Sequence, residues 1–137
     1  MQIKNFIVST NGPGLYEITS QIAQWINGDG LLTLLIKHTS ASLLIQENAD
    51  PEVKFDFTQF LERLVPPSSS PEMSYLTHTY EGPDDMPAHI KSGLLPTTLS
   101  IPIENGKMTL GTWQGIYLVE HRLSARRREI TACLLLA

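Results

Sequence analysis

The first group of residues able to do chemistry follows an apolar segment that ends at His38. An imidazole titrates near neutrality, so His38 could be an acid, a base or a metal ligand. The hydroxyls of Thr39 and Ser40 could bind a phosphate or an oxyanion. Glu47 and Asp50 could hold a hard cation such as magnesium. The structural alternative is that Asp50 caps the helix that follows and that the hydroxyl residues form a turn.

The second group lies between His78 and His89, where two histidines, one glutamate and two aspartates fall within twelve residues. Imidazoles and carboxylates suit zinc, iron or manganese. A loop between the histidines could fold both rings onto one centre. The structural alternative is a surface loop in which Asp84 or Asp85 caps a short helix. The segment has no zinc signature of defined spacing.

The third group is a glycine-flanked segment, followed by an acidic strand end. Trp113 could stack on a heteroaromatic ring, and Gln114 could hydrogen-bond one. Glu120 shares a strand face with apolar residues, so a functional role or a paired arginine is expected for its carboxylate. Arg122, the first of a group of arginines, could bind phosphate through two hydrogen bonds. Alternatively, Trp113 is a core residue and the arginines protect a sheet edge.

Composition limits the class of protein. The chain has 137 residues, 42 % hydrophobic and 18 % charged, which predicts one globular domain spanning residues 1–137. A net charge of −4 argues against a nucleic-acid-binding surface. The single cysteine and the absence of a signal-like start favour a cytoplasmic location. Apolar runs are too short for a membrane span, and the chain has no P-loop, GxSxG, GxGxxG or CxxC motif.

Periodicity predicts the elements that must position these groups. Apolar spacing predicts helices over 16–27, from Asp50-Pro51 to Pro66, and from near Pro87. Alternating or continuous apolar runs predict strands, and Asn105-Gly106 predicts a hairpin turn. The predicted strands cover 2–10, 31–38, 42–46, 98–103, 108–113, 116–120 and 129–136, and residues 75–80 could form another. We therefore expect an α+β fold with an antiparallel-rich mixed sheet of about seven strands and about three helices.

Four short motifs together resemble the YjbQ family. They are HTSA at 38–41, ENADP at 47–51, PAHIK at 87–91 and LGTWQ at 110–114. The resemblance covers nearly the whole chain. It implies a compact α+β homotrimer with a secondary thiamine-phosphate synthase activity, which joins hydroxymethylpyrimidine diphosphate to a thiazole phosphate and releases pyrophosphate. It also implies a small phosphorylated or anionic ligand and a divalent metal, zinc or magnesium.

The motifs and the resemblance together assign a role to each candidate residue. The expected catalytic residues are His38, Asp50, Asp85 and Glu120. The expected substrate-binding residues are Thr39, Ser40, Glu47, Asn48, Trp113, Gln114 and Arg122. The expected metal ligands are His38, His78 and His89. The main hypothesis is an enzyme acting on a phosphorylated small molecule. The alternatives are a non-catalytic trimeric protein that binds an anion or metabolite, and a metal-dependent hydrolase with a three-histidine centre.

Overall fold

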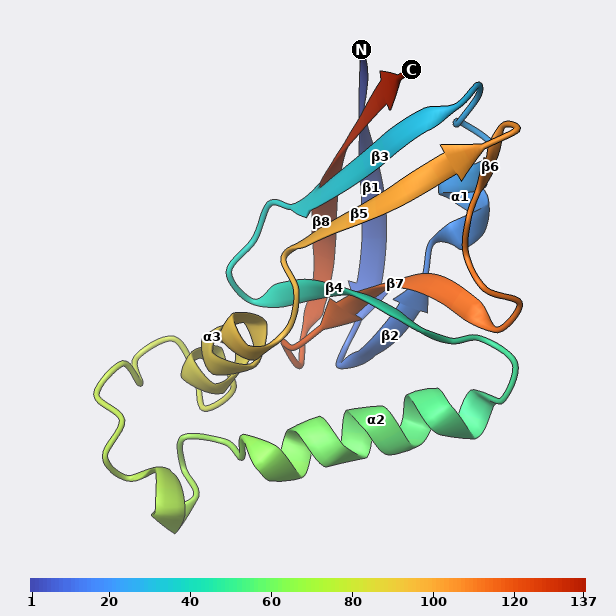
Figure 1. Ribbon diagram of the computed structural model, residues 1–137. Coiled ribbons are helices and arrows are strands. Elements are labelled where there is room, and N and C mark those ends of the chain that lie inside the picture. The colour runs from blue at the N-terminus through green and yellow to red at the C-terminus, as the bar shows by residue number, and fades with distance from the viewer.

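The computed structural model describes all residues from 1 to 137. The chain forms eight strands, three α-helices and one 3₁₀ turn (Figure 1). In chain order they are β1 (Gln2–Asn11), β2 (Gly14–Glu17), α1 (Thr19–Ala23), β3 (Gly30–Ile36), β4 (Ala41–Glu47), α2 (Pro51–Leu64), the 3₁₀ turn (Pro71–Met73), α3 (Asp85–Leu94), β5 (Thr98–Glu104), β6 (Lys107–Met108), β7 (Gln114–Glu120) and β8 (Ala125–Leu136).

The strands form two sheets, and every pairing within them is antiparallel. The larger sheet has the order β1-β8-β3-β5-β6 and the smaller one the order β2-β7-β4. One core of fifteen buried residues contains side chains from both sheets and from the segment around α1, including Leu34, Leu118 and Ile22. The α+β class is therefore confirmed, with three helices and antiparallel sheets.

Some predicted elements differ from the structure. Residues 14–17 pair with β7 as a strand, so the predicted helix over 16–27 shortens to Thr19–Ala23. Strand pairing of residues 14–17 with β7 prevails over the helical spacing of the apolar residues there. Ile18 and Ile22, which the helical pattern placed on the apolar face, are still buried in the structure. Residues 75–80 form no strand, and of 108–113 only Met108 belongs to one.

The two longer helices flank the smaller sheet (Figure 1). Asp50 caps α2 by accepting the backbone N–H of Glu52 at 2.9 Å, and Pro51 occupies the first turn. Leu61 of α2 packs in a second small core with Tyr117 and Val119 of β7. Helix α3 begins at Asp85, earlier than predicted, and lies against β4. The loop and helix that carry the histidines are therefore held at one end of β4.

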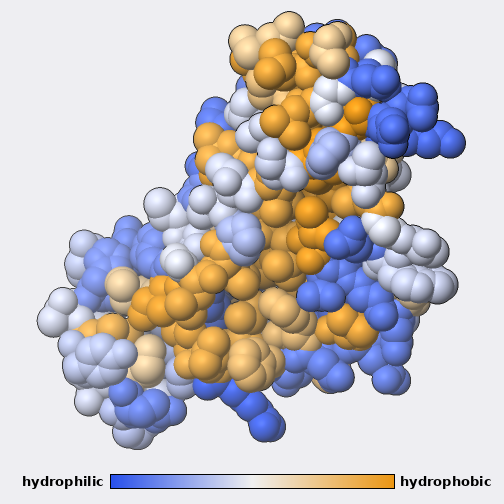
Figure 2. Space-filling model, in the orientation of Figure 1, coloured by the Kyte–Doolittle hydropathy of each residue, from blue (hydrophilic) through white to orange (hydrophobic).

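One face of the larger sheet is apolar and uncovered. Strand β3 buries alternate residues and exposes the others, because its period of two points them to opposite faces. The exposed large apolar residues on β1, β3 and β8 are Ile3, Ile7, Leu31, Leu35 and Leu135. Figure 2 shows apolar surface extending from the end of the sheet near both termini towards the helices. No helix combines the length and the apolar character needed to cross a bilayer.

Candidate metal centre

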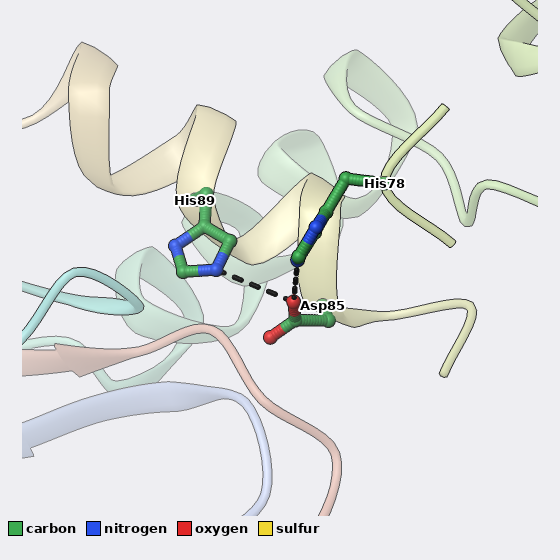
Figure 3. Close-up of side chains that lie close together, drawn as sticks. All are labelled: His78, Asp85 and His89. Carbon is green, nitrogen blue, oxygen red and sulfur yellow. Dashed lines mark hydrogen bonds and ion pairs between the residues drawn. The ribbon is translucent and has the colours of Figure 1, made fainter. Parts of the chain in front are cut away.

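Two histidines and an aspartate converge at the start of α3. The Nε2 atom of His78, in the preceding loop, lies 2.8 Å from Asp85 Oδ2. The Nε2 atom of His89, one helical turn after Asp85, lies 3.3 Å from the same oxygen. Figure 3 shows both rings directed at that carboxylate. Potential ligand atoms of the three residues lie within 4.8 Å of one another.

The orientation of His89 is set by the backbone. Its Nδ1 lies 2.8 Å from the carbonyl oxygen of Thr39, which can only accept, so Nδ1 carries a proton. In the neutral ring, Nε2 then holds a lone pair that faces the carboxylate oxygen of Asp85. Two lone pairs at that distance repel, unless a cation lies between them or the ring is protonated. A backbone carbonyl on Nδ1 is the usual partner of a metal-binding histidine.

Asp85 is buried but remains ionised. Its Oδ1 accepts from Arg122 Nη1 at 2.7 Å, while Arg122 Nε donates to Asp84 at 2.9 Å. Burial alone would raise the pKa of Asp85, but its hydrogen bond with His78 and the nearby positive charge of Arg122 hold that pKa below its ordinary value. Arg122, expected to bind phosphate, therefore orients Asp85. Its two ion pairs leave Oδ2 of Asp85 as the oxygen that faces the histidines.

The three residues fit a transition metal better than magnesium. Two imidazole nitrogens and one carboxylate are a ligand set that zinc, iron and manganese accept, whereas magnesium prefers oxygen. For metal–ligand bonds of about 2.1 Å, ligand atoms should be about 3.0–3.4 Å apart. The Asp85 oxygen lies 2.8 and 3.3 Å from the two nitrogens. These two distances are close to that range, and all three ligand atoms lie within 4.8 Å of one another.

Beside the centre is an open hollow of about 250 Å³, which has no hydrophobic lining residue. His38 and His89 form part of its wall, together with Thr39, Ser92, Gly93 and Thr97. His38 Nε2 accepts the backbone N–H of Glu129 at 2.8 Å, so the proton of the neutral ring is on Nδ1. Burial, followed by the charge of Arg128, lowers the pKa of His38 and favours that neutral ring.

The grouping differs from the expected three-histidine centre. His38 lines the hollow, but its Nε2 is engaged by the backbone of β8. Asp85 stands with His78 and His89 instead. In this arrangement His38 is a hydrogen-bond donor at the edge of the centre. A sequence pattern cannot distinguish these roles, because they depend on which backbone group meets each ring nitrogen.

Glu120 is fully occupied by internal partners. Its carboxylate accepts from Thr10 Oγ1 at 2.6 Å and from Arg128 Nε at 2.8 Å, and it also pairs with Arg128 Nη2. Burial alone would raise the pKa of Glu120, but these hydrogen bonds and the Arg128 charge lower it. Arg128 Nη2 also donates to Ser40 Oγ at 3.0 Å. Glu120 is therefore paired with an arginine, which was one of the two expectations for its carboxylate. The same arginine links Ser40 of the HTSA motif to β7 and β8.

The remaining candidates lie at the other end of the smaller sheet. Ala41 is paired with Glu120, whereas Glu47 is paired with Gln114. Six residues of strand separate these pairs, which is about 20 Å. The side chain of Trp113 is 63 % exposed, and its carbonyl accepts from Asn48 N at 2.9 Å. Within one chain, the structure therefore does not bring Glu47, Asn48, Asp50, Trp113 and Gln114 to the histidines.

Sequence reasoning did not single out His121 or Ser42. Both are buried, and Ser42 Oγ lies 2.9 Å from His121 Nε2. Burial, followed by the charge of Lys91, lowers the pKa of His121 to about 4. His121 directly follows Glu120, which was already a candidate residue, so the sequence offered a reason to consider this histidine as well.

Comparison with known proteins identifies the family. The model of the family described as UPF0047 protein YjbQ-like matches residues 4–135. The UPF0047 protein YjbQ of Escherichia coli O157:H7 is 43 % identical over 96 % of this chain and 95 % of its own length. A Synechocystis UPF0047 protein is 44 % identical over 90 % of this chain and 84 % of its own length.

Solved structures agree with this match. A conserved hypothetical protein from Thermus thermophilus is 33 % identical and superposes with a TM-score of 0.84, covering 96 % of this chain and 99 % of its own. An uncharacterised YjbQ/UPF0047 protein from Clostridium acetobutylicum is 31 % identical, with the same TM-score and the same coverage of both chains. This chain belongs to the YjbQ (UPF0047) family.

Proposed function

We propose that the chain is a metal-dependent enzyme acting on a phosphorylated small molecule, with its centre at His78, Asp85 and His89. The supporting observation is that His89 Nδ1 lies 2.8 Å from the Thr39 carbonyl oxygen, so that in the neutral ring the Nε2 lone pair faces Asp85 Oδ2 at 3.3 Å and the two repel each other. A divalent cation between these atoms would remove the repulsion. When bound, such a metal would act as a Lewis acid on a phosphoryl oxygen.

The hollow beside the centre supports an anionic substrate. The proton on His38 Nδ1 and the exposed hydroxyls of Thr39 and Thr97 are hydrogen-bond donors for phosphate oxygens. The nearby cations are already paired: Arg122 with Asp84 and Asp85, and Arg128 with Glu120. A phosphate in the hollow therefore depends on the metal and on neutral donors. Asp85 remains the metal-directed carboxylate because Arg122 holds its other oxygen.

The reaction to assay first is thiamine-phosphate synthesis, which the family resemblance suggests. A released diphosphate needs a cation to stabilise it, and the proposed metal would supply one. The homotrimer and the cytoplasmic location are part of the same proposal. The uncovered apolar face of the larger sheet supports association, because exposed patches of this kind are typical of interfaces. A neighbouring subunit could also bring the Trp113 end of its smaller sheet to this centre.

The first experiment is elemental analysis of tag-free protein. We expect about one transition-metal ion per chain, which should be lost in His78→Ala and His89→Ala. The matched control is His121→Gln, which removes a histidine outside the centre and should keep the metal. Wild-type protein that takes up no transition metal, even after incubation with zinc, manganese or ferrous iron, would refute the metal centre.

Activity separates the remaining functions. Purified metal-loaded protein is given hydroxymethylpyrimidine diphosphate and thiazole phosphate, and pyrophosphate release is measured. A parallel assay follows phosphate release from simple phosphate esters, which would indicate a hydrolase. In either assay, His38→Ala and His89→Ala should abolish turnover while the protein remains folded. Ligand binding without turnover in both assays would favour the non-catalytic anion-binding alternative.

A further inference from the structure

A second cavity lies between α2 and α3, apart from the hollow beside the metal centre. It offers about 50 Å³ of space to water-sized groups and contains two buried polar side chains in its wall, Lys91 and His121. Its apolar wall is formed by Val65, Pro67, Pro83, Pro87 and Leu123. Glu62 and Asp84 complete the lining. Taking about 10–15 Å³ of such space for one water, the cavity has room for roughly three to five water-sized groups.

Lys91 brings unused hydrogen-bond donors to this cavity. Its side chain is 4 % exposed, and its ammonium donates to Glu62 Oε1 at 2.9 Å. An ammonium has three N–H donors, and this is the one bond it makes to the protein. Burying a charged group without enough partners is unfavourable. The remaining N–H groups therefore require an acceptor inside the cavity.

His121 supplies another donor. The buried hydroxyl of Ser42 has His121 Nε2, at 2.9 Å, as its one partner. We assign the hydroxyl as the donor and Nε2 as the acceptor, because the opposite direction would leave the buried O–H without an acceptor. The proton of the neutral ring is then on Nδ1. Glu47 Oε2 is the one buried side-chain nitrogen or oxygen that lacks a partner. His121 Nδ1 also makes no hydrogen bond but is not among the fully enclosed atoms, so it has some exposed surface, and His121 lines the cavity.

We infer that this cavity binds a small monocarboxylate, whose carboxylate accepts from Lys91 Nζ and His121 Nδ1 and whose short apolar body packs on the prolines, Val65 and Leu123. A charge-assisted bond to the ammonium favours an anion over a neutral carbonyl. The carboxylates of Glu62 and Asp84 line the same space and disfavour a dianion such as phosphate. The site is separate from the proposed metal centre and does not depend on the proposed function.

The pairing of Glu62 makes entry of a carboxylate feasible. The Glu62 side chain is 36 % exposed, whereas Lys91 is almost fully buried. Glu62 can turn towards solvent when a ligand takes its place, but Lys91 cannot leave without losing its packing. Asp84 is held by Arg122 Nε at 2.9 Å and by the Leu123 backbone N–H at 3.0 Å, so the opposite wall stays in place.

The test uses the full chain and isobutyrate as the probe, followed by ¹⁵N NMR of the histidine rings. Before ligand is added, His121 should show the Nδ1–H tautomer. Isobutyrate should shift the His121 ring and the Lys91 ammonium with a Kd on the order of 1 mM, as expected for so small a ligand. The isosteric amide, isobutyramide, and inorganic phosphate should each bind at least about tenfold more weakly, a discrimination typical of one charge-assisted contact.

A variant pair completes the test. Lys91→Met keeps the length of the side chain and removes the ammonium, and it should weaken isobutyrate binding at least about tenfold. Lys37→Met removes another ion-paired lysine, which does not line the cavity, and should leave binding unchanged. An Nε2–H tautomer, no His121 shift at about 20 mM isobutyrate, or phosphate binding as tightly as isobutyrate would each overturn the inference. The first two readings need only wild-type protein, so they stand even if Lys91→Met does not fold.

Discussion

The buried ring of His121 should make the protein lose stability in mild acid. Its pKa is lowered from the ordinary value of 6.5 to about 4, because burial and then the charge of Lys91 disfavour the protonated ring. As the pH falls through 6.5, the unfolded chain takes up a proton that the folded chain refuses until about pH 4. Between these values the unfolded state binds more protons, so the free energy of unfolding falls with the pH.

The size of the effect follows from the two pKa values. A difference between 6.5 and about 4 corresponds to about 3 kcal/mol when fully expressed, and about 2 kcal/mol should already be lost at pH 5. The stabilisation is complete above pH 6.5 and absent below pH 4. Carboxylates with lowered pKa values, such as Glu120, lose their contribution only below about pH 4.5. The window from pH 6.5 to 4.5 therefore reports on histidines.

The assay is urea denaturation of wild type, His121→Gln and His38→Gln at several pH values in that window. A glutamine can keep the hydrogen bond to Ser42 without titrating, so His121→Gln should flatten the curve by about 2 kcal/mol at pH 5. His38 also has a lowered pKa and shares the direction of the effect, so its variant measures that separate contribution. Parallel curves for wild type and His121→Gln would refute the reasoning.

Three further stability measurements test the packing. Glu120→Gln should cost about 3–5 kcal/mol in denaturant unfolding because it leaves Arg128 buried without a counter-charge; recovery is expected when the apolar pair Glu120→Leu, Arg128→Met replaces both. Gly30→Ala should destabilise the fold by about 2–4 kcal/mol, because the new Cβ would lie 2.0 Å from the backbone carbonyl oxygen of Leu135 in β8. The matched variant Gly115→Ala should cost less, because its Cβ would lie 2.7 Å from the side-chain carboxylate of Glu17, which can move away. Asp50→Ala should cost about 1 kcal/mol by removing the α2 cap.

Strong local signals made much of the fold predictable. Asp50-Pro51 predicted the start of α2, and Asn105-Gly106 predicted the β5–β6 turn, where both residues have positive φ. The segment 16–27 shows the limit of periodicity. Its apolar spacing suits a helix, yet residues 14–17 pair with β7. The division into two sheets was also not predictable, because it depends on pairings between strands far apart in the sequence.

The candidate site was predictable by residue type but not by grouping. His78, Asp85 and His89 lie in one short segment, so their convergence follows from local folding. The ENADP and LGTWQ motifs meet each other at Glu47 and Gln114, at the far end of β4. The sequence analysis assigned all these residues to one site, because the spacing of motifs contains no information on strand direction or register. The role of His38 depended on the Glu129 backbone N–H, a contact across ninety-one residues.

The arrangement of charge around the centre constrains its chemistry. Two arginines near the histidines already serve buried acids: Arg122 serves Asp85 and Arg128 serves Glu120. Removing either of these cations to bind a phosphate would leave a buried carboxylate without its partner, which is unfavourable. The arginine-rich segment that suggested phosphate binding thus stabilises the fold. For the phosphorylated substrate that we propose, the two imidazoles with Asp85 offer the place where a divalent metal would provide the counter-charge.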